Sequence, residues 1–375
     1  MTSLSRVSGP LDAPAYQEEA AFARTDAMMP IASVIIVNYN GRHHLEKCIP
    51  SLRREGGLDY EIILVDNAST DGSAAYVERA FPEVRVVRSG ANLGFGQGSN
   101  VGARQARGRY LAFLNSDTVV EPGWLEALIV ALEADPQAGL ATSKILLVSD
   151  PGRINTCGNE MHFTGLTLCR GMGMERSALA DLEEVTAVSG AAFVIRRALF
   201  EALGGFDETF FLYMEDTDLS WRARLAGYRC LCVPQSVVHH DYNLRFGPKK
   251  TFYQERNRYL MLLKSLRWRT LMFLLPALLL AEVITWGFML LWERQRLANK
   301  LQAYAWIVEH WEEVMESRRR TQALRRLRDR DLLARCAYRL AYEQFDSGLI
   351  ARLAHIVFDP LFSALHRLAM AWIWW

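Results

Sequence analysis

The stretch Tyr110-Leu-Ala-Phe-Leu-Asn-Ser-Asp-Thr118 is an apolar run of strand-forming residues that ends in polar residues, among them Asp117. The same pattern occurs upstream, where the apolar run at 62–65 ends in Asp66. In open α/β sheets, ligands bind at the carboxyl ends of buried strands. The two runs therefore predict neighbouring strands whose acidic ends contribute to one site.

Short aliphatic segments bounded by turn residues recur over the first 240 residues, with helical patterns between them. We expect strands at 33–38, 61–66, 84–87, 110–114, 139–146, 189–196 and 229–240. We expect helices near 43–55, 71–80, 96–107 and 215–226, and a hairpin or loop at 150–185. Strand–helix alternation of this length gives parallel crossovers, so the predicted class is a three-layer α/β sandwich.

The composition allows a large core and argues against a nucleic-acid partner. Half of the 375 residues are hydrophobic and the formal net charge is +1. A chain with so little net charge has no overall field to attract nucleic acid. The six cysteines contain no CxxC pair, which favours reduced thiols in the cytosol. Residues 1–29 show no signal-peptide pattern, and we interpret them as a flexible tail.

The character of the chain changes at about 250–265, which divides a domain at 30–260 from a helical region at 261–375. An apolar run at 271–292 is long enough to cross a bilayer, but Glu282 at its middle would be costly there. Amphipathic and Arg-rich segments follow. We expect a membrane-associating extension that binds an anionic membrane surface, peripherally or shallowly inserted. A buried helix in a homo-oligomer is the alternative.

Residues at the ends of the first three strands and just after them are candidates for binding a nucleotide. They are the polar residues Asn38, Tyr39, Asn40, Asp66, Asn67 and Asn92, and also Gly94. A strand-end carboxylate can accept hydrogen bonds from a base or ribose, and glycines allow a close backbone approach. Ordinary turns and helix caps, with Ser69 or Thr70 as the cap, explain part of this pattern equally well. A dinucleotide fingerprint is disfavoured because the glycines follow the third strand.

Asn115, Ser116 and Asp117 form a candidate site for a metal ion and a diphosphate. Mg²⁺ and Mn²⁺ prefer oxygen ligands, and a dication stabilises a departing diphosphate. His239 and His240 close the last strand, and strand alternation turns one of them inward, where a neutral imidazole could complete the site. The alternative for Asp117 is a cap on the next helix.

Glu215, Asp216 and Asp218 crowd the first turn of a predicted helix among several aromatic residues. The helix dipole favours acids there, which explains at least one of them, and we assign Asp218 to this role. A carboxylate that faces a sugar pocket can instead accept a hydroxyl proton as a general base. We expect Asp216 to have a pKa near or below the usual value of about 3.9.

Six segments in this order resemble those of the inverting family 2 glycosyltransferases with a GT-A fold, especially the rhamnosyltransferase-like and galactofuranosyltransferase-like enzymes. The segments are 37–40, 65–73, 92–96, 114–117, 190–197 and 210–219, within a matching region at 33–260. The expected fold class is therefore an α/β GT-A domain with a C-terminal helical, membrane-associating extension.

The resemblance also implies roles for single residues. Asp66 would contact the nucleotide, and Asp117 would be the remaining carboxylate of a metal-binding Asp-x-Asp element, since Asn115 replaces the other. Asp216 would be the catalytic base, with Glu215 beside it, and His239 would be a partner in the metal site. Arg256-Asn257 resemble a short Arg-Asn element of the family.

The resemblance implies an inverting, metal-assisted transferase on the cytoplasmic side of the cell membrane. The implied partners are a nucleotide-diphosphate sugar donor, carrying rhamnose or a hexose, and a glycan or lipid-linked acceptor in cell-surface polysaccharide synthesis. The implied cofactor is Mn²⁺ or Mg²⁺. Two other classes stay open, namely a catalytically inert nucleotide-sugar-binding membrane scaffold and a nucleotide-dependent oxidoreductase.

Overall fold

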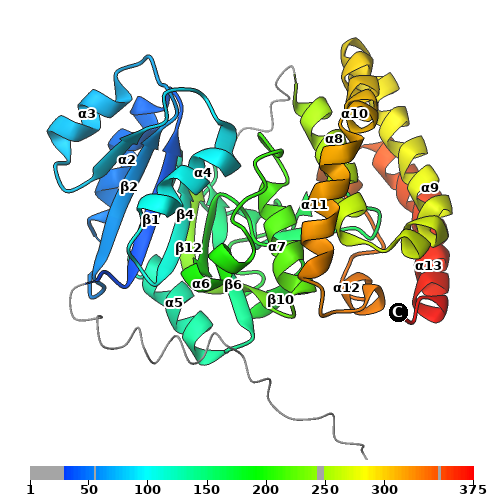
Figure 1. Ribbon diagram of the computed structural model, residues 1–375. Helices are drawn as coiled ribbons and strands as arrows, with labels where there is room; N and C mark the ends of the chain where they lie inside the picture. The colour runs from blue at the N-terminus through cyan, green and yellow to red at the C-terminus, as the bar shows by residue number, and fades with distance from the viewer. Residues whose placement is uncertain (1–28, 55, 243–248, 345–347) are drawn as a thin grey trace, which may run out of the picture.

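The computed structural model describes residues 29–375 except 55, 243–248 and 345–347 (Figure 1). The flexible tail expected at 1–29 thus lies outside the described residues, apart from Met29. Within the described part, one mixed 10-stranded sheet runs in the order β10-β12-β6-β11-β4-β1-β2-β3, with β5 paired to β12 and β7 paired to β6. A separate two-stranded sheet joins β8 and β9.

The first half of the sheet is parallel, as the strand–helix alternation predicts. Its strands are β1 (Ala32–Asn38), β2 (Tyr60–Asp66), β3 (Arg85–Arg88) and β4 (Tyr110–Asn115). The crossovers are α2 (Arg42–Leu52), α3 (Ser73–Ala80) and α4 (Gly94–Gln105). Asn38 is in register with Asp66, and Val37 with Asn115. The polar ends of three strands therefore meet at one edge of the sheet.

The second half is mixed, because β11 runs antiparallel to both β4 and β6. Its strands are β5 (Thr118–Val120), β6 (Ala138–Leu147), β7 (Ile154–Thr156), β8 (Asn159–Met161), β9 (Thr167–Cys169), β10 (Glu183–Val185), β11 (Ala192–Arg196) and β12 (Arg229–His240). Its helices are α5 (Trp124–Ala134), α6 (Arg197–Ala202) and α7 (Glu215–Leu225). The segment expected as a hairpin or loop holds β7 to β10.

Alternate residues of the central strands fill two separate cores. Ile36 and its same-face neighbours pack with apolar residues of α2, α3 and α5. Ile35 and its neighbours pack with residues of α4, α6 and α7. Burying both faces of a sheet under helices gives a three-layer sandwich, so the expected architecture is confirmed.

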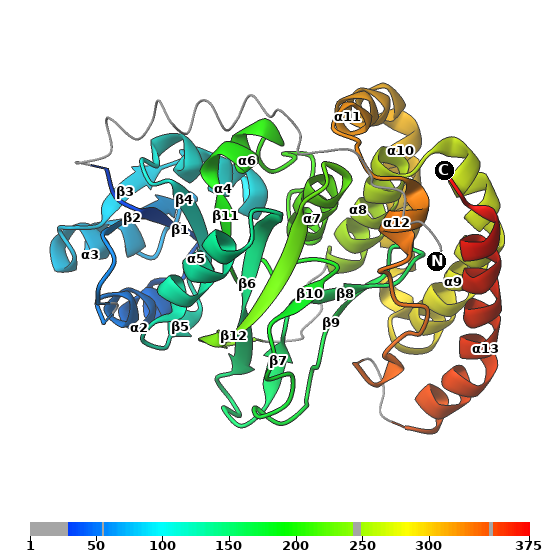
Figure 2. The same cartoon turned by 90° about the horizontal axis from the view of Figure 1, so that it is seen from below.

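A bundle of helices packs beside this sandwich, next to α7 (Figures 1 and 2). Its helices are α8 (Lys250–Ser265), α9 (Trp268–Trp292), α10 (Leu297–Glu309), α11 (Trp311–Ala323), α12 (Asp329–Leu333) and α13 (Leu349–Trp372). A third core joins the bundle to Trp221 and Leu225 of α7. The amphipathic part of the chain expected after the apolar run forms two helices, α10 and α11, because the helix breaks at His310.

Candidate active site

The residues at the end of β1 contact the turn that follows β2. Asn38 is buried and its Nδ2 donates to Ser69 Oγ at 3.2 Å. Asn40 has a φ of 54° and its Oδ1 accepts the Thr70 N–H at 2.7 Å. Tyr39 between them is 54% exposed. The structure therefore brings these three predicted residues together and leaves the Tyr39 ring accessible.

Asn38 and Asp66 present unused acceptors at the same edge. Both side chains are buried, and neither Oδ1 has a hydrogen-bond partner among the described residues. Because buried polar atoms are normally paired, two such atoms in register indicate a place for donor groups of a ligand. The expected cap of α3, Ser69 or Thr70, is wrong. Instead Asp71 Oδ1 accepts the N–H of Ser73, the first residue of the helix, at 3.0 Å.

Asn67, Asn92 and Gly94 shape the wall of this site. Asn67 Nδ2 donates to the Gly94 carbonyl oxygen at 2.8 Å, and Asn92 Oδ1 accepts the Gly94 N–H at 3.1 Å. Gly94 has a φ of 76°, and a Cβ there would lie 2.0 Å from the carbonyl oxygen of Phe211. The close approach that the glycine allows is thus to the chain itself, at the loop before α7.

Asp117 lies in the turn from β4 to β5 and faces His240. The antiparallel register pairs Thr118 with His240, and Asp117 Oδ1 lies 3.3 Å from His240 Nε2. Burial raises the pKa of Asp117, but the hydrogen bond and charge of His240 outweigh it, so the pKa is lowered. His240 Nδ1 lies 3.1 Å from Asn155 Oδ1, which orients the ring. Asp117 does not cap α5, which begins at Trp124.

His239, the predicted metal partner, points elsewhere. Its Nε2 lies 2.8 Å from Glu121 Oε1, whereas His240 faces Asp117. The structure therefore places the neighbouring histidine at Asp117. Asn155, which orients His240, was missed because nothing in its segment marks it as part of a site.

The turn at Asn115 and Ser116 joins the Asp117 site to the first strand. Asn115 donates its N–H to the Ala191 carbonyl oxygen at 2.9 Å, and its own carbonyl oxygen accepts from Thr118 Oγ1 at 2.7 Å. A Cβ on Gly41 would lie 3.4 Å from Ser116 Oγ, so Ser116 lies close to the segment after β1.

Asp117 and His240 are two side chains of types that can bind a metal ion, which is fewer than a complete cage needs. No group of three or more His, Cys, Asp or Glu side chains that could hold a metal ion occurs among the described residues. A Mg²⁺-type ion is commonly bound through one or two carboxylates, with substrate phosphates and water as the other ligands. The pair therefore fits an ion that arrives with a diphosphate.

Asp216 accepts several hydrogen bonds at the start of α7. Its Oδ2 accepts from the Gly190 N–H at 2.7 Å and from Asn159 Nδ2 at 3.1 Å, and its Oδ1 accepts from the Thr217 N–H at 2.6 Å. Burial raises the pKa of Asp216, and the Gly190 and Thr217 donors offset this only in part, so the pKa is raised. The expected pKa near or below the usual value is therefore wrong.

Glu215 is buried next to Asp216, and its Oε2 has no hydrogen-bond partner among the described residues. Burial, followed by the charges of Asp216 and Asp218, raises the pKa of Glu215 to about 8. At neutral pH this carboxyl group is mostly protonated.

Asp218 lies in the first turn of α7, as expected, and it is also an ion-pairing residue in the core. Its side chain is fully buried, with Oδ1 2.8 Å from Lys264 Nζ and Oδ2 2.7 Å from Arg222 Nε. Lys264 comes from α8, and Arg222 lies one turn along α7. Breaking a buried pair leaves an uncompensated charge, so this contact fixes α7 against the helical bundle.

The loop that leads into Glu215 has a strained backbone. Tyr213 and Met214 have φ values of 68° and 66°. Residues other than Gly rarely adopt such positive φ angles. Asn257 on α8 holds the loop, because its Nδ2 donates to the carbonyl oxygens of Leu212 at 3.0 Å and Tyr213 at 2.7 Å. Arg256 donates to the Thr209 carbonyl oxygen at 2.6 Å. The predicted Arg-Asn element therefore positions this loop.

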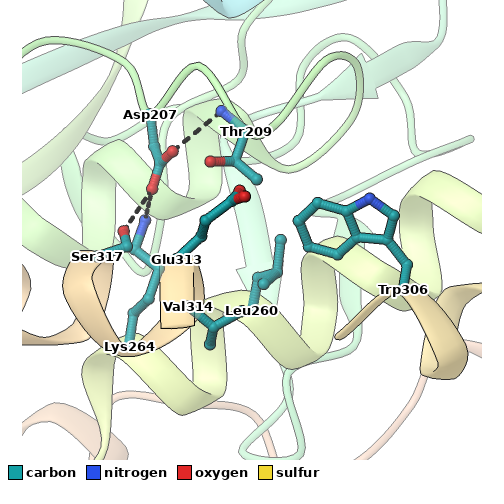
Figure 3. Close-up of a pocket in the computed structure, with 8 residues that line it drawn as sticks. All are labelled: Asp207, Thr209, Leu260, Lys264, Trp306, Glu313, Val314 and Ser317. Carbon is teal, nitrogen blue, oxygen red and sulfur yellow. Dashed lines mark hydrogen bonds and ion pairs between the residues drawn. The ribbon is translucent and has the colours of Figure 1, made fainter. Parts of the chain in front are cut away.

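A small cavity lies behind the same loop (Figure 3). Its polar side holds Asp207, whose carboxylate accepts from Lys264 and, at 2.8 Å, from Ser317 of α11. Trp306 of α10 closes the other side. The cavity measures about 10 Å³, enough for about one water molecule, so it is no substrate site. It shows how closely the loop packs on α8, α10 and α11.

Known proteins share sequence with this chain. The family model described as "Glycosyl transferase family 2" matches residues 33–204. The chain is 31% identical over 244 residues to the N-acetylglucosaminyl-diphospho-decaprenol L-rhamnosyltransferase of Mycobacterium tuberculosis, covering 57% of this chain and 77% of that protein. It is 28% identical over 193 residues to an O-antigen biosynthesis protein of Myxococcus xanthus, covering 48% of this chain and 15% of that protein.

Solved structures share the fold. The S. aureus TarS 1–349 structure in complex with UDP-GlcNAc gives a TM-score of 0.53 at 16% identity, covering 91% of this chain and 90% of that one. The GalNAc-T7 structure with UDP, GalNAc and Mn²⁺ gives 0.52 at 21% identity, covering 63% and 48%. These similarities confirm the expected α/β GT-A class.

Proposed function

Because this chain belongs to glycosyl transferase family 2, we propose that it inverts the anomeric carbon of a sugar, rhamnose or a hexose, as it transfers it from a nucleotide-diphosphate donor. One arrangement carries the proposal. The Gly190 N–H binds Asp216, and the next residue, Ala191, binds the N–H of Asn115 in the turn that carries Asp117. The proposed base and the proposed diphosphate site are thus built on consecutive peptide groups.

The nucleotide binds over the ends of β1 and β2 in this proposal. The unpaired Oδ1 atoms of Asn38 and Asp66 accept hydrogen bonds from donor groups of the base or ribose. The accessible Tyr39 ring covers the base, and Asn40 holds the turn beneath it. Asn67, Asn92 and Gly94 form the wall, while Asn115 and Ser116 lie next to the diphosphate.

Asp117 and His240 would hold a divalent ion, Mn²⁺ or Mg²⁺, in this proposal. When bound, such an ion neutralises charge on the leaving diphosphate. The lowered pKa of Asp117 keeps its carboxylate ionised for this role. Asn155 holds the His240 ring from its other side, as partners of metal-binding histidines commonly do. His239 was expected here, and His240 takes its place in the proposal.

Asp216 removes the proton from the acceptor hydroxyl as the new C–O bond forms at the anomeric carbon. The bond from that carbon to the diphosphate breaks, and the diphosphate leaves with the electron pair. The raised pKa makes Asp216 a stronger base than an exposed aspartate. Glu215 stays protonated beside it, so its carboxyl group can donate a hydrogen bond.

We assign the acceptor to the glycans and lipid-linked sugars of cell-surface polysaccharide synthesis, at the cytoplasmic side of the membrane. Support comes from the relative whose name specifies an N-acetylglucosaminyl-diphospho-decaprenol. Two helices, α9 and α13, are also apolar and long enough to associate with a membrane. The alternative of an inert scaffold predicts donor binding without turnover.

A donor panel tests the proposal. Purified protein is incubated with UDP-, GDP- and dTDP-sugars, with and without Mn²⁺, and with a lipid-linked sugar as the acceptor. We expect turnover of one donor class, dependence on the metal, and an NMR coupling that shows the inverted anomer. Retention of configuration would overturn the role of Asp216 as the base, and donor binding without turnover would favour the scaffold.

A further inference from the structure

The helices α9 and α13 lie side by side on the outer side of the helical bundle, away from the sheet (Figure 2). In their most apolar parts, only 28% of α9 and 11% of α13 is buried. A core helix of a soluble domain would be mostly buried. These two helices therefore present a face that the described part of the chain leaves uncovered.

The exposed side chains of α9 form one stripe. Met272, Leu275, Leu279 and Val283 are all exposed and follow one another at spacings of three or four residues. Such spacing places them on one side of a helix. Its opposite side, which includes Leu274 and Ala281, is buried in the core of the bundle.

The exposed side chains of α13 form a second stripe. Ile350, Leu353, Val357 and Leu361 repeat at spacings of three and four, and all are exposed. A groove of about 190 Å³ runs between the two helices, lined only by apolar residues and Pro276. The two stripes and the groove make one surface, which we call the α9/α13 face.

The charges of α9 and α13 are distributed in a way that fits an anionic partner. Each helix contains one acidic residue, and both acids are turned to partners. Glu282 binds groups on α8 and α10, and Asp359 lies 3.0 Å from the ring of His355. The exposed charged side chains of the two helices are all arginines, namely Arg269, Arg352 and Arg367.

Exposed tryptophans lie at the helix ends, namely Trp268, Trp292 and Trp372. Tryptophan side chains suit the headgroup zone of a bilayer.

The contacts of Glu282 argue against α9 crossing a membrane. Its carboxylate accepts from Arg258 and Tyr259 of α8 and, at 2.5 Å, from Tyr304 of α10, while Lys300 Nζ lies 3.1 Å away. Burial raises the pKa of Glu282, but Arg258 and these partners lower it to about 2. A spanning helix would carry this ionic cluster into the hydrocarbon, at high cost.

From these observations we infer that the α9/α13 face docks in the plane of an anionic lipid leaflet, with its stripes among the acyl chains and its arginines at the phosphates. The inference deepens the proposed function and rests on it in one respect, since a lipid-linked acceptor would lie in the same leaflet. A second copy of the chain is the competing occupant, and it would not account for the arginines and tryptophans around the face.

The test is co-flotation of the full chain with vesicles of phosphatidylcholine alone or mixed with phosphatidylglycerol. We compare the wild type with Leu279→Glu/Val283→Glu on α9 and Leu353→Glu/Val357→Glu on α13. The matched control is Val130→Glu/Leu182→Glu, whose side chains are similarly exposed, at 57% and 50%, but lie outside this face. We expect binding to the mixed vesicles to fall at least about tenfold in both face variants and not in the control.

Three results would overturn the inference. One is unchanged flotation of both face variants. Another is resistance of the bound chain to alkaline carbonate extraction, which indicates a spanning helix. The third is a chain that does not bind vesicles but forms a dimer, which the face substitutions convert to a monomer. That result indicates that a second copy of the chain covers the face. Donor turnover with a water-soluble acceptor is measured without vesicles, so failure of the proposed function is seen separately from failure of docking.

Discussion

Lys264 on α8 places its ammonium 2.8 Å from the carboxylate of Asp218 on α7, and both side chains are almost fully buried. Asp218 lies two residues after the proposed base, so this ion pair links the first turn of α7 to the helical bundle. Asn257 of the same helix holds the strained loop that precedes α7. The bundle therefore supports the proposed active site.

Lys264→Met should destabilise the fold strongly. The substitution leaves Asp207 and Asp218 without their shared cation, and breaking a buried pair in this way costs about 3–5 kcal/mol. Urea unfolding measures the loss. The control is Arg319→Gln, which removes an exposed pair with Glu316 and should change the unfolding free energy little. Equal stability of the two variants would contradict the structural role of Lys264.

Asp216→Asn should reduce turnover by a factor of about 10²–10⁴ and keep donor affinity within a few-fold. Asn cannot take the acceptor proton, and its amide would place an N–H group opposite the donors that surround Asp216. Some loss of stability should therefore accompany the loss of turnover. Steady-state kinetics and donor titration on the same preparation separate the two effects.

Asp218→Asn serves as the comparison. It weakens the pairs with Lys264 and Arg222, so we expect a lower unfolding midpoint, while the folded fraction keeps most of its turnover. If Asp218→Asn abolished turnover at full stability and Asp216→Asn did not, the base would have to be Asp218.

Glu215 should make the fold less stable as the pH rises. Its pKa is raised from the ordinary 4.5 to about 8 in the fold, so the folded state binds the extra proton between these values. This contribution to stability is complete below about pH 4.5 and is lost as the pH rises through about 8. Glu215→Gln removes the titrating group, so its unfolding free energy relative to wild type should increase with pH across that range. A constant difference from about pH 5 to 9 would show that the carboxyl group is not held protonated.

The strand ends of the site could be predicted because each is a local pattern, an apolar run closed by a polar residue. Asp66 and Asp117 lie at the sheet edge for that reason. The role of Asp218 could not be predicted, because its partner Lys264 is distant in sequence and looks like any lysine near a helix end. Locally, Asp218 resembles a residue that caps the helix dipole.

The choice between His239 and His240 depended on strand register. Alternation along β12 puts them on opposite faces but does not say which face meets Asp117. The pairing of β12 with β6 shifts between Val233 and Val237, so counting residues along β12 fails. Only the pairing of β12 with β5, which aligns His240 with Thr118, decides the matter.

Asp117→Ala should abolish metal-dependent donor binding, since an ion between the diphosphate and the protein would lose its carboxylate. His240→Ala should weaken the Mn²⁺ dependence, whereas His239→Ala should leave it unchanged, because His239 binds Glu121 instead. Isothermal titration of a nucleotide-diphosphate sugar at several Mn²⁺ concentrations measures the coupling between metal and donor. The two histidine variants are matched in chemistry and adjacent in sequence, and differ in which of them faces Asp117. Loss of coupling in His239→Ala with normal coupling in His240→Ala would refute the proposed metal pair and return the role to His239.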